Sequence, residues 1–364
     1  MSSEFVSERG RKVVGHELYM LRLAFEHNPY PGLSGTFEEY IRVSDGVVVV
    51  RPFESLNSRI RSAGSGARVA VLSDVDGTLG QEREGLDESA HEEPSLDRQG
   101  WQNLMIPIFA RFLADNSDLS FEESEAVTVK KAEYSMGKPT LVQTGAVVDH
   151  CHLHMERSPL YFDDVPLFDP QLVKGKYTSR LDDKVDQRRG VYSPEELRIA
   201  GPCAFLDCLK GLGYRVIFGS GTDVDKIKET LARLELDDLA EEGDIYAAGG
   251  TLKHWQCAKR YIVEMLKKEP GFDGRLTLAQ GDGRPEIYEV ANVGGISVAI
   301  ATPSICKYNP DHFTSEMKRD GLIEAGATMY VEVDKNGGID VQGLNKVVHE
   351  GVPERYLRTA KVRD

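Results

Sequence analysis

The fold of this chain is decided by residues 69–79, which read Val-Ala-Val-Leu-Ser-Asp-Val-Asp-Gly-Thr-Leu. The apolar run Val69–Leu72 is typical of a buried strand, and a tight glycine-containing turn with two carboxylates, Asp74 and Asp76, follows it. Two carboxylates one residue apart can divide a reaction between them, because one can attack or bind metal while the other handles protons. An Asp-rich turn that caps the next helix would look the same, so the motif needs support from elsewhere in the chain.

Two later strand-like stretches supply that support. Residues 214–223 (Tyr-Arg-Val-Ile-Phe-Gly-Ser-Gly-Thr-Asp) end in glycine and hydroxyl residues before an amphipathic helix, an arrangement that favours anion binding at the helix N-terminus. Residues 276–286 (Leu-Thr-Leu-Ala-Gln-Gly-Asp-Gly-Arg-Pro-Glu) end in Asp282 and Glu286. Acidic groups at a strand end need a positive partner, and a hard divalent cation is the usual one. Between the two stretches lie Lys253 and Lys259, either of which could bring positive charge to a phosphate.

In this order of Asp-x-Asp, Ser, Lys and Gly-Asp, the chain resembles the phosphatase branch of the haloacid dehalogenase (HAD) superfamily. The resemblance covers residues 69–90 and 200–333, does not cover residues 1–65, and is weak between residues 90 and 195. Within the superfamily, residues 281–287 followed by residues 294–299 resemble phosphosugar-type phosphatases.

The resemblance implies a phosphomonoester hydrolase that works through an aspartyl-phosphate. Asp74 would attack the substrate phosphorus, Asp76 would protonate the leaving alcohol and then activate water, and Thr78 would brace the turn. Mg²⁺ would be bound by Asp74, the carbonyl of Asp76 and Asp282, with Glu286 holding a metal-bound water. Magnesium is favoured over zinc because all of these ligands are oxygen atoms.

The same resemblance assigns the phosphate cradle. Ser220 and the N–H groups of Gly221 and Val75 would contact the phosphoryl oxygens, and a lysine would hold their charge. Lys259 is preferred because it opens a helical pattern, and a rigid element positions a charge better than a loop does. Lys253 lies in a glycine-rich loop and is the alternative.

The pattern from residue 200 onward predicts an α/β fold. Helical and strand patterns alternate there, which indicates a doubly wound, mostly parallel sheet with its site at the carboxyl ends of the strands. Parallel strands need only one helix between them, so the long stretch from residue 81 to residue 199 is predicted to be an inserted, mainly helical cap domain. Residues 67–80 and 200–364 would form the catalytic core.

Residues 1–66 are predicted to be a separate N-terminal extension of unknown role, joined through a small flexible linker at residues 62–67. Helical periodicity at residues 17–25 and a strand pattern at residues 46–50 suggest that it has structure of its own. These elements could dock on the core, cover its edge or make a homo-oligomer contact, and the sequence does not choose among them.

The cap would supply substrate identity. Residues 137–143 resemble cap segments that face the cleft in phosphosugar phosphatases, so Lys138, Thr140 and Gln143 are candidate substrate contacts. A surface turn with a solvated lysine is the competing interpretation of Lys138.

A histidine cluster follows in the same domain. In a strand, His150, His152 and His154 would share one face and could bind zinc. Against this, structural zinc sites usually join ligands distant in sequence, so substrate contact and an ordinary polar surface remain alternatives.

Composition limits the partners. The formal charge of −15 argues against nucleic acid and acidic membranes as partners, although a metal and a lysine could still attract a small anion into a cleft. The five cysteines are an odd, scattered set rather than a disulfide framework, and the first residues lack the apolar segment of a leader. We therefore expect a reduced, cytoplasmic protein that acts on a small phosphorylated metabolite, with a phosphosugar favoured.

Two alternatives stay open. A phosphomutase of the same superfamily would use Asp76 in the same way but return the phosphoryl group to the sugar. A catalytically silent binding protein that keeps the fold is disfavoured by the full set of motif residues.

Overall fold

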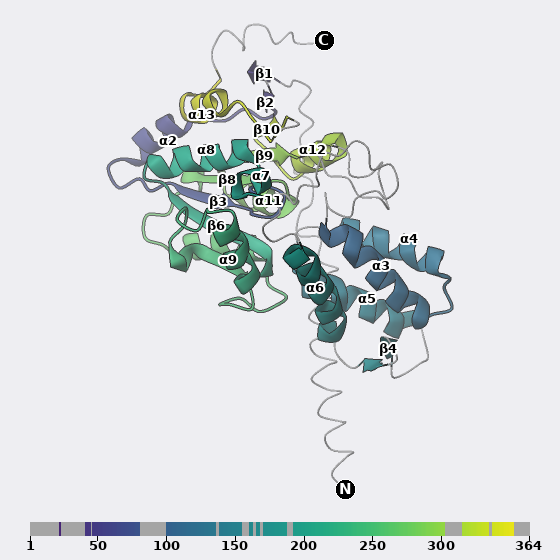
Figure 1. Ribbon diagram of the computed structural model, residues 1–364. Coiled ribbons are helices and arrows are strands. Elements are labelled where there is room, and N and C mark those ends of the chain that lie inside the picture. The colour runs from purple at the N-terminus through teal and green to yellow at the C-terminus, as the bar shows by residue number, and fades with distance from the viewer. Residues whose placement is uncertain are drawn as a thin grey trace.

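The computed structural model describes residues 22, 41–44, 46–80, 100–135, 138–154, 160–162, 165–167, 170–187, 192–302, 315–334 and 337–352. These residues form a sheet covered by helices on both faces and a helical unit beside it (Figure 1).

The central sheet confirms the predicted fold class. Its strands are β1 (Ile41–Ser44), β2 (Val47–Val49), β3 (Ala70–Ser73), β6 (Arg215–Asp223), β7 (Ile245–Ala248), β8 (Thr277–Gly281), β9 (Ile296–Ala301) and β10 (Met329–Glu332). In the described part of the chain these eight strands are ordered β1-β2-β10-β9-β8-β3-β6-β7. All pairs from β10 to β7 are parallel, whereas β1 and β2 run antiparallel to their neighbours. The strand order reverses between β3 and β8, which is where a doubly wound sheet places its ligand site.

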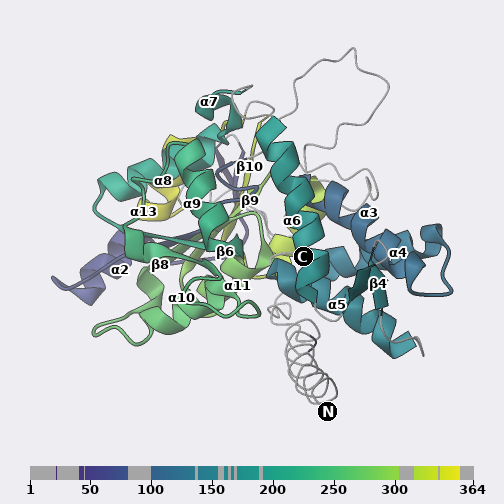
Figure 2. The same cartoon turned by 60° about the horizontal axis from the view of Figure 1, so that its bottom comes forward.

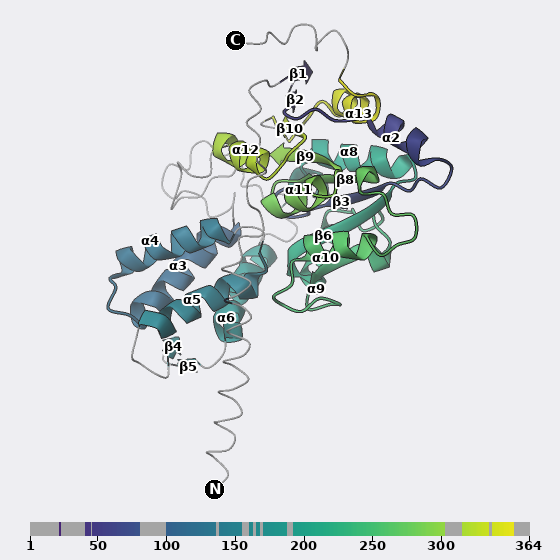
Figure 3. The same ribbon diagram turned by 180° about the vertical axis from the view of Figure 1, so that it is seen from behind.

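Helices cover both faces of the sheet (Figures 1 and 3). One face carries α2 (Leu56–Ala63), α8 (Ala200–Gly211), α9 (Val224–Arg233) and α13 (Val341–Glu350), and the other carries α10 (Ala258–Leu266), α11 (Arg284–Ala291) and α12 (Ser315–Glu324). Strand residues alternate between the two: Val71 joins the apolar cluster of the first face, and Leu72 packs with Ile262 on the second. This two-sided burial explains why the core strands read as continuous apolar runs.

The inserted segment forms a mainly helical cap, as predicted. It contains α3 (Gly100–Asp115), α4 (Phe121–Tyr134), α5 (Thr140–His154), a short hairpin of β4 (Leu160–Phe162) and β5 (Val165–Leu167), and α6 (Pro170–Gln187). Phe109 and Phe112 of α3 pack with Val147 of α5 and Val173 of α6 in an apolar core separate from that of the sheet. In Figure 2 the cap helix α6 lies between the core and the other cap helices, and its Asp182 pairs with Lys226 of α9 at 2.8 Å. Among the described residues no helix is both long and apolar enough to span a bilayer.

The strand predicted at residues 46–50 docks on the core. Val48 of β2 pairs with Tyr330 of β10, so β2 and β1 extend the sheet beyond its parallel part. This placement answers the question that the sequence left open for this strand. We propose that the core begins at Ile41 rather than at residue 67. The helical pattern at residues 17–25 lies, apart from residue 22, outside the described residues.

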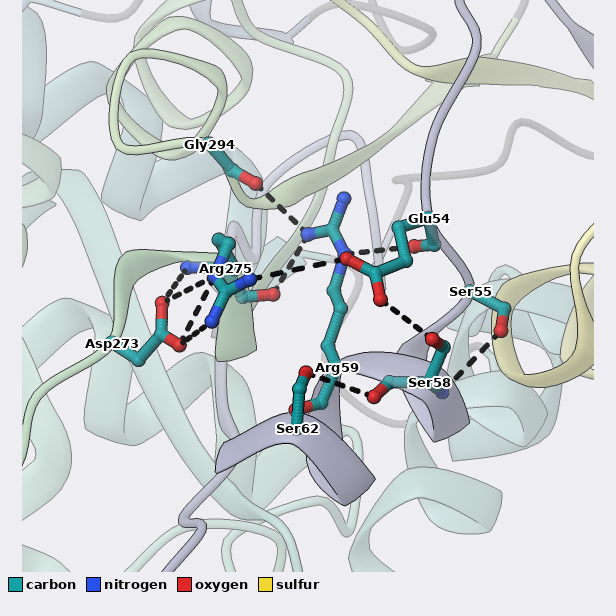
Figure 4. Close-up of polar contacts among 8 residues, drawn as sticks. All are labelled: Glu54, Ser55, Ser58, Arg59, Ser62, Asp273, Arg275 and Gly294. Carbon is teal, nitrogen blue, oxygen red and sulfur yellow. Dashed lines mark hydrogen bonds and ion pairs between the residues drawn. The ribbon is translucent and has the colours of Figure 1, made fainter. Parts of the chain in front are cut away.

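A buried arginine of α2 forms hydrogen bonds with the core (Figure 4). Ser55 caps the helix by accepting from the Ser58 N–H, and Arg59, 6% exposed, extends from its next turn. Arg59 Nε donates to the Glu54 carbonyl at 2.7 Å, and its Nη1 donates to the carbonyls of Arg275 at 2.7 Å and Gly294 at 2.8 Å. The segment before the predicted linker is therefore joined to two loops of the core.

Candidate active site

The turn after β3 is built for close approach to β8. The Asp74 N–H donates to the carbonyl of Gln280 at 3.2 Å, which fixes the start of the turn beside the end of β8. Gly77 has a φ of +79°, and a Cβ there would overlap the carboxylate of Asp282. Glycine is needed on both counts, because other residues rarely adopt this conformation and no space exists for a side chain.

Asp74 and Lys259 form a buried ion pair at the carboxyl ends of the strands. Lys259 Nζ lies 3.0 Å from Asp74 Oδ1, and the lysine is 2% exposed. Burial raises the pKa of Asp74 to about 6, and the Asp282 and Asp76 carboxylates add to this while Lys259 opposes it. Burial by itself lowers the pKa of Lys259, but the Asp74 and Glu286 carboxylates outweigh it and the net shift is upward. Lys259 therefore stays charged, and Asp74 is largely ionised at neutral pH.

Asp74, Asp282 and Glu286 form an acidic cluster. One carboxylate oxygen of each lies within 4.8 Å of the others. Glu286 Oε1 accepts from the Gly283 N–H at 2.6 Å, whereas its buried Oε2 has no hydrogen-bond partner and lies 3.8 Å from Lys259 Nζ. Burial raises the pKa of Glu286 to about 8, with Asp74 as the next contributor. An all-oxygen set with one unsatisfied buried oxygen fits Mg²⁺ with its bound water.

Asp282 is held from two sides. Its Oδ1 accepts from Thr78 Oγ1 at 3.0 Å, and its own N–H donates back to the same hydroxyl at 3.0 Å. Its Oδ2 accepts from Lys318 Nζ at 2.5 Å. Thr78 thus joins the turn after β3 to the end of β8.

Asp76 and Ser220 lie on the turn after β3 and at the end of β6. Asp76 is exposed, and its Oδ2 accepts from Thr222 Oγ1 at 3.0 Å. Ser220 is buried, and its Oγ accepts from the Thr222 N–H at 3.0 Å. Gly221 lies between these two hydroxyl residues, just before α9. The structure therefore brings the second carboxylate of Asp-x-Asp next to the predicted phosphate cradle.

The two candidate lysines, Lys259 and Lys253, lie in different surroundings. Lys259 reaches Asp74, whereas Lys253 is exposed and its Nζ lies 5.4 Å from the centre of the Trp255 ring. Trp255 in turn packs against Leu141 and Val142 at the start of α5, so its loop is a contact between core and cap.

The three candidate substrate contacts in the cap, Lys138, Thr140 and Gln143, have different neighbours from one another. Lys138 is 8% exposed, and burial lowers its pKa to about 8 while the nearby Cys257 opposes that shift. Because Cys257 is the N-cap residue of α10, two residues before Lys259, Lys138 lies at the core side of the cap. Gln143 instead donates Nε2 to the Ser135 carbonyl at 3.2 Å, within the cap. Thr140 is the first residue of α5, and its carbonyl accepts from Thr144 Oγ1 at 2.9 Å.

The zinc interpretation of the histidine cluster rested on a strand, and the structure has a helix there. His150, His152 and His154 all lie on α5, so the strand that this interpretation assumed is not present at these residues.

Three contacts at the site were not predicted from the sequence. Thr222 donates to Asp76, Thr302 Oγ1 donates to the Gly77 carbonyl at 2.7 Å, and Lys318 pairs with Asp282. Thr222 follows the Ser-Gly pair directly, so its hydroxyl could have been included in the anion-site motif. Lys318 lies in α12, and nothing in its local sequence distinguishes it from a surface lysine.

No protein-family model and no curated protein sequence matches this chain. Solved structures that it resembles include a hydrolase from Pseudomonas syringae, at 13% identity over 77% of this chain and 99% of that one, with a TM-score of 0.45. A β-phosphoglucomutase from Clostridium difficile matches at 12% identity over 71% and 98%, with a TM-score of 0.43. A HAD family hydrolase from Deinococcus radiodurans, solved with phosphate and sodium, matches at 17% identity over 78% and 96%, with a TM-score of 0.39.

Proposed function

We propose that the chain is a HAD-type phosphatase that hydrolyses a small phosphorylated metabolite, with a phosphosugar favoured. One observation carries the proposal. Lys259 Nζ lies 3.0 Å from Asp74 Oδ1, and the carboxylates of Asp282 and Glu286 lie close to that of Asp74. The cluster is at the ends of β3 and β8, where the strand order of the sheet reverses. A buried nucleophile, a fixed positive charge and an oxygen cluster for a cation are the groups that phosphoryl transfer to a carboxylate needs.

Mg²⁺ fits the acidic cluster. Asp74, Asp282 and the carbonyl of Asp76 would bind it, and Glu286 Oε2 would accept from a water that it holds. When bound, the cation would reduce the repulsion between the Asp74 carboxylate and the anionic phosphoryl group.

In the first step an oxygen of Asp74 would attack phosphorus as the bond from phosphorus to the ester oxygen breaks. Asp76 would give its proton to that oxygen, so the product leaves as an alcohol rather than an alkoxide. Ser220 and the N–H of Gly221 would donate to the phosphoryl oxygens, and Lys259 would hold their charge.

In the second step Asp76, now ionised, would accept a proton from water. The resulting hydroxide would attack phosphorus and break its bond to Asp74, which restores the free carboxylate and releases inorganic phosphate. Thr222 Oγ1, which donates to Asp76 Oδ2, would keep that carboxylate beside Ser220 in both steps.

The cap would select the substrate. Lys138 lies near Cys257 at the core side of the cap, so its ammonium would contact an anionic or hydroxylated part of the substrate remote from the reacting phosphorus.

The test is phosphate release from a panel of phosphorylated sugars, polyols, nucleotides and amino acids. Asp74→Asn should remove both turnover and the covalent intermediate, and Asp76→Asn should slow turnover by roughly 10²–10⁴-fold. Chelation should stop the reaction and Mg²⁺ restore it. Near-native activity of the Asp74 variant would show that the assigned chemistry is wrong. A phosphomutase would instead convert the phosphosugar in the presence of a bisphosphate activator without net phosphate release.

A further inference from the structure

Lys318 is a second lysine in the acidic cluster, and the proposed reaction gives it no role. It extends from α12, and its Nζ lies 2.5 Å from Asp282 Oδ2 and 3.5 Å from the carbonyl of Thr302. The side chain is 9% exposed and that of Asp282 is 15% exposed, so water screens the pair only partly.

This lysine is not needed to orient Asp282. The carboxylate is already fixed through Oδ1 by Thr78, whose hydroxyl bonds both the side chain and the N–H of Asp282. Lys318 donates to the other oxygen, Oδ2, and its main effect is therefore to neutralise part of the charge of the Asp282 carboxylate. Lys259 differs, because it faces Asp74 and Glu286 on the other side of the cluster.

We infer that Lys318 restrains the affinity of the acidic cluster for divalent cations. The inference rests on the proposed function, in which Asp282 is a metal ligand. A divalent cation and the ammonium then share one carboxylate, so they repel each other at short distance in a partly desolvated site, where such repulsion is strong. The ammonium also neutralises part of the charge that attracts the cation. An anionic phosphate offsets the same positive charge, so cation and phosphate bind more tightly together than either does alone.

The experiment measures Mg²⁺ binding directly, by titration calorimetry on the full chain without substrate. Lys318→Met should bind Mg²⁺ at least roughly tenfold more tightly than the wild type, given the size of a charge interaction at this range. Lys318→Gln should show the same increase in Mg²⁺ affinity, and it replaces the Met variant in the test if that variant does not fold. Lys318→Arg keeps the charge and should keep the wild-type affinity.

The control is Lys267→Met, which removes a lysine that pairs with Glu264 on the surface and should leave Mg²⁺ affinity unchanged. Affinity in the neutral Lys318 variants that equals or falls below that of a Mg²⁺-binding wild type overturns the inference and leaves the proposed function standing. A wild type that binds no Mg²⁺, together with neutral variants that bind none, overturns both the metal assignment and the inference.

Discussion

Lys259 and Lys253 are alike in chemistry but face different surroundings. Lys259 is buried against Asp74 and Glu286, whereas Lys253 is exposed beside Trp255. Methionine keeps the apolar stem and removes the charge, so Lys259→Met should lower kcat/KM by roughly 10²-fold or more, as the loss of one transition-state donor does. Lys253→Met should change it little. Steady-state kinetics on both variants, with circular dichroism as a check on folding, decide the ranking, and a larger loss in the Lys253 variant would reverse it.

The lowered pKa of Lys138 has a consequence for the dependence of substrate binding on pH. Burial lowers this pKa to about 8, so the ammonium is charged below that pH and neutral above it. If Lys138 contacts an anionic substrate, KM should rise about tenfold between pH 7 and pH 9, because about nine tenths of the charge is lost one unit above a pKa. Lys138→Arg should remove this rise, and Lys138→Met should give a high KM at both values. A KM in the wild type that does not change with pH would place Lys138 outside the substrate contact.

At the scale of elements, Arg59 supplies polar contacts that attach α2 to the core, in addition to the apolar packing of Leu56. Arg59→Met leaves the carbonyls of Glu54, Arg275 and Gly294 without their donor, so unfolding in urea should show a loss of about 2–4 kcal/mol. Arg61, exposed in the last turn of the same helix, is the matched control, and Arg61→Met should stay within about 0.5 kcal/mol of the wild type. Equal stabilities of the two variants would mean that the contacts of Arg59 contribute nothing net.

The elements were predictable where the signal was local. The apolar run before Asp74 and the amphipathic pattern after residues 214–223 are properties of a few adjacent residues, and the structure has β3 at Ala70–Ser73 and α9 at Val224–Arg233. The alternation of helix and strand from residue 200 onward likewise predicted a mostly parallel sheet, and the strands from β10 to β7 are parallel. By contrast, the contacts of Lys318 and Arg59 depend on how distant segments pack, and no local pattern encodes them. The pairing of β2 with β10 was left open for the same reason.

At the scale of the whole molecule, the cap and core are joined beside the reacting groups. Lys174 of α6 lies 2.7 Å from Asp223, the residue after Thr222, which donates to Asp76. Lys174→Met should therefore loosen the cap, raise KM several-fold and speed hydrogen exchange in α6 and at the start of α9. Lys228→Met changes an exposed lysine of α9 and serves as the control. Unchanged exchange and KM in the Lys174 variant would show that this ion pair does not hold the cap.

The pairing of Val48 with Tyr330 has a consequence for the order in which the chain is made. β2 leaves the ribosome long before β10 exists, so during most of translation it can pair with β1 on one edge while the edge that later pairs with β10 stays open. A short apolar strand with an open edge is prone to pair with other chains. A protein truncated before β10 should therefore accumulate as aggregate. Deleting β1 and β2 from that truncated protein should restore part of its solubility, because the open edge of β2 would then be absent.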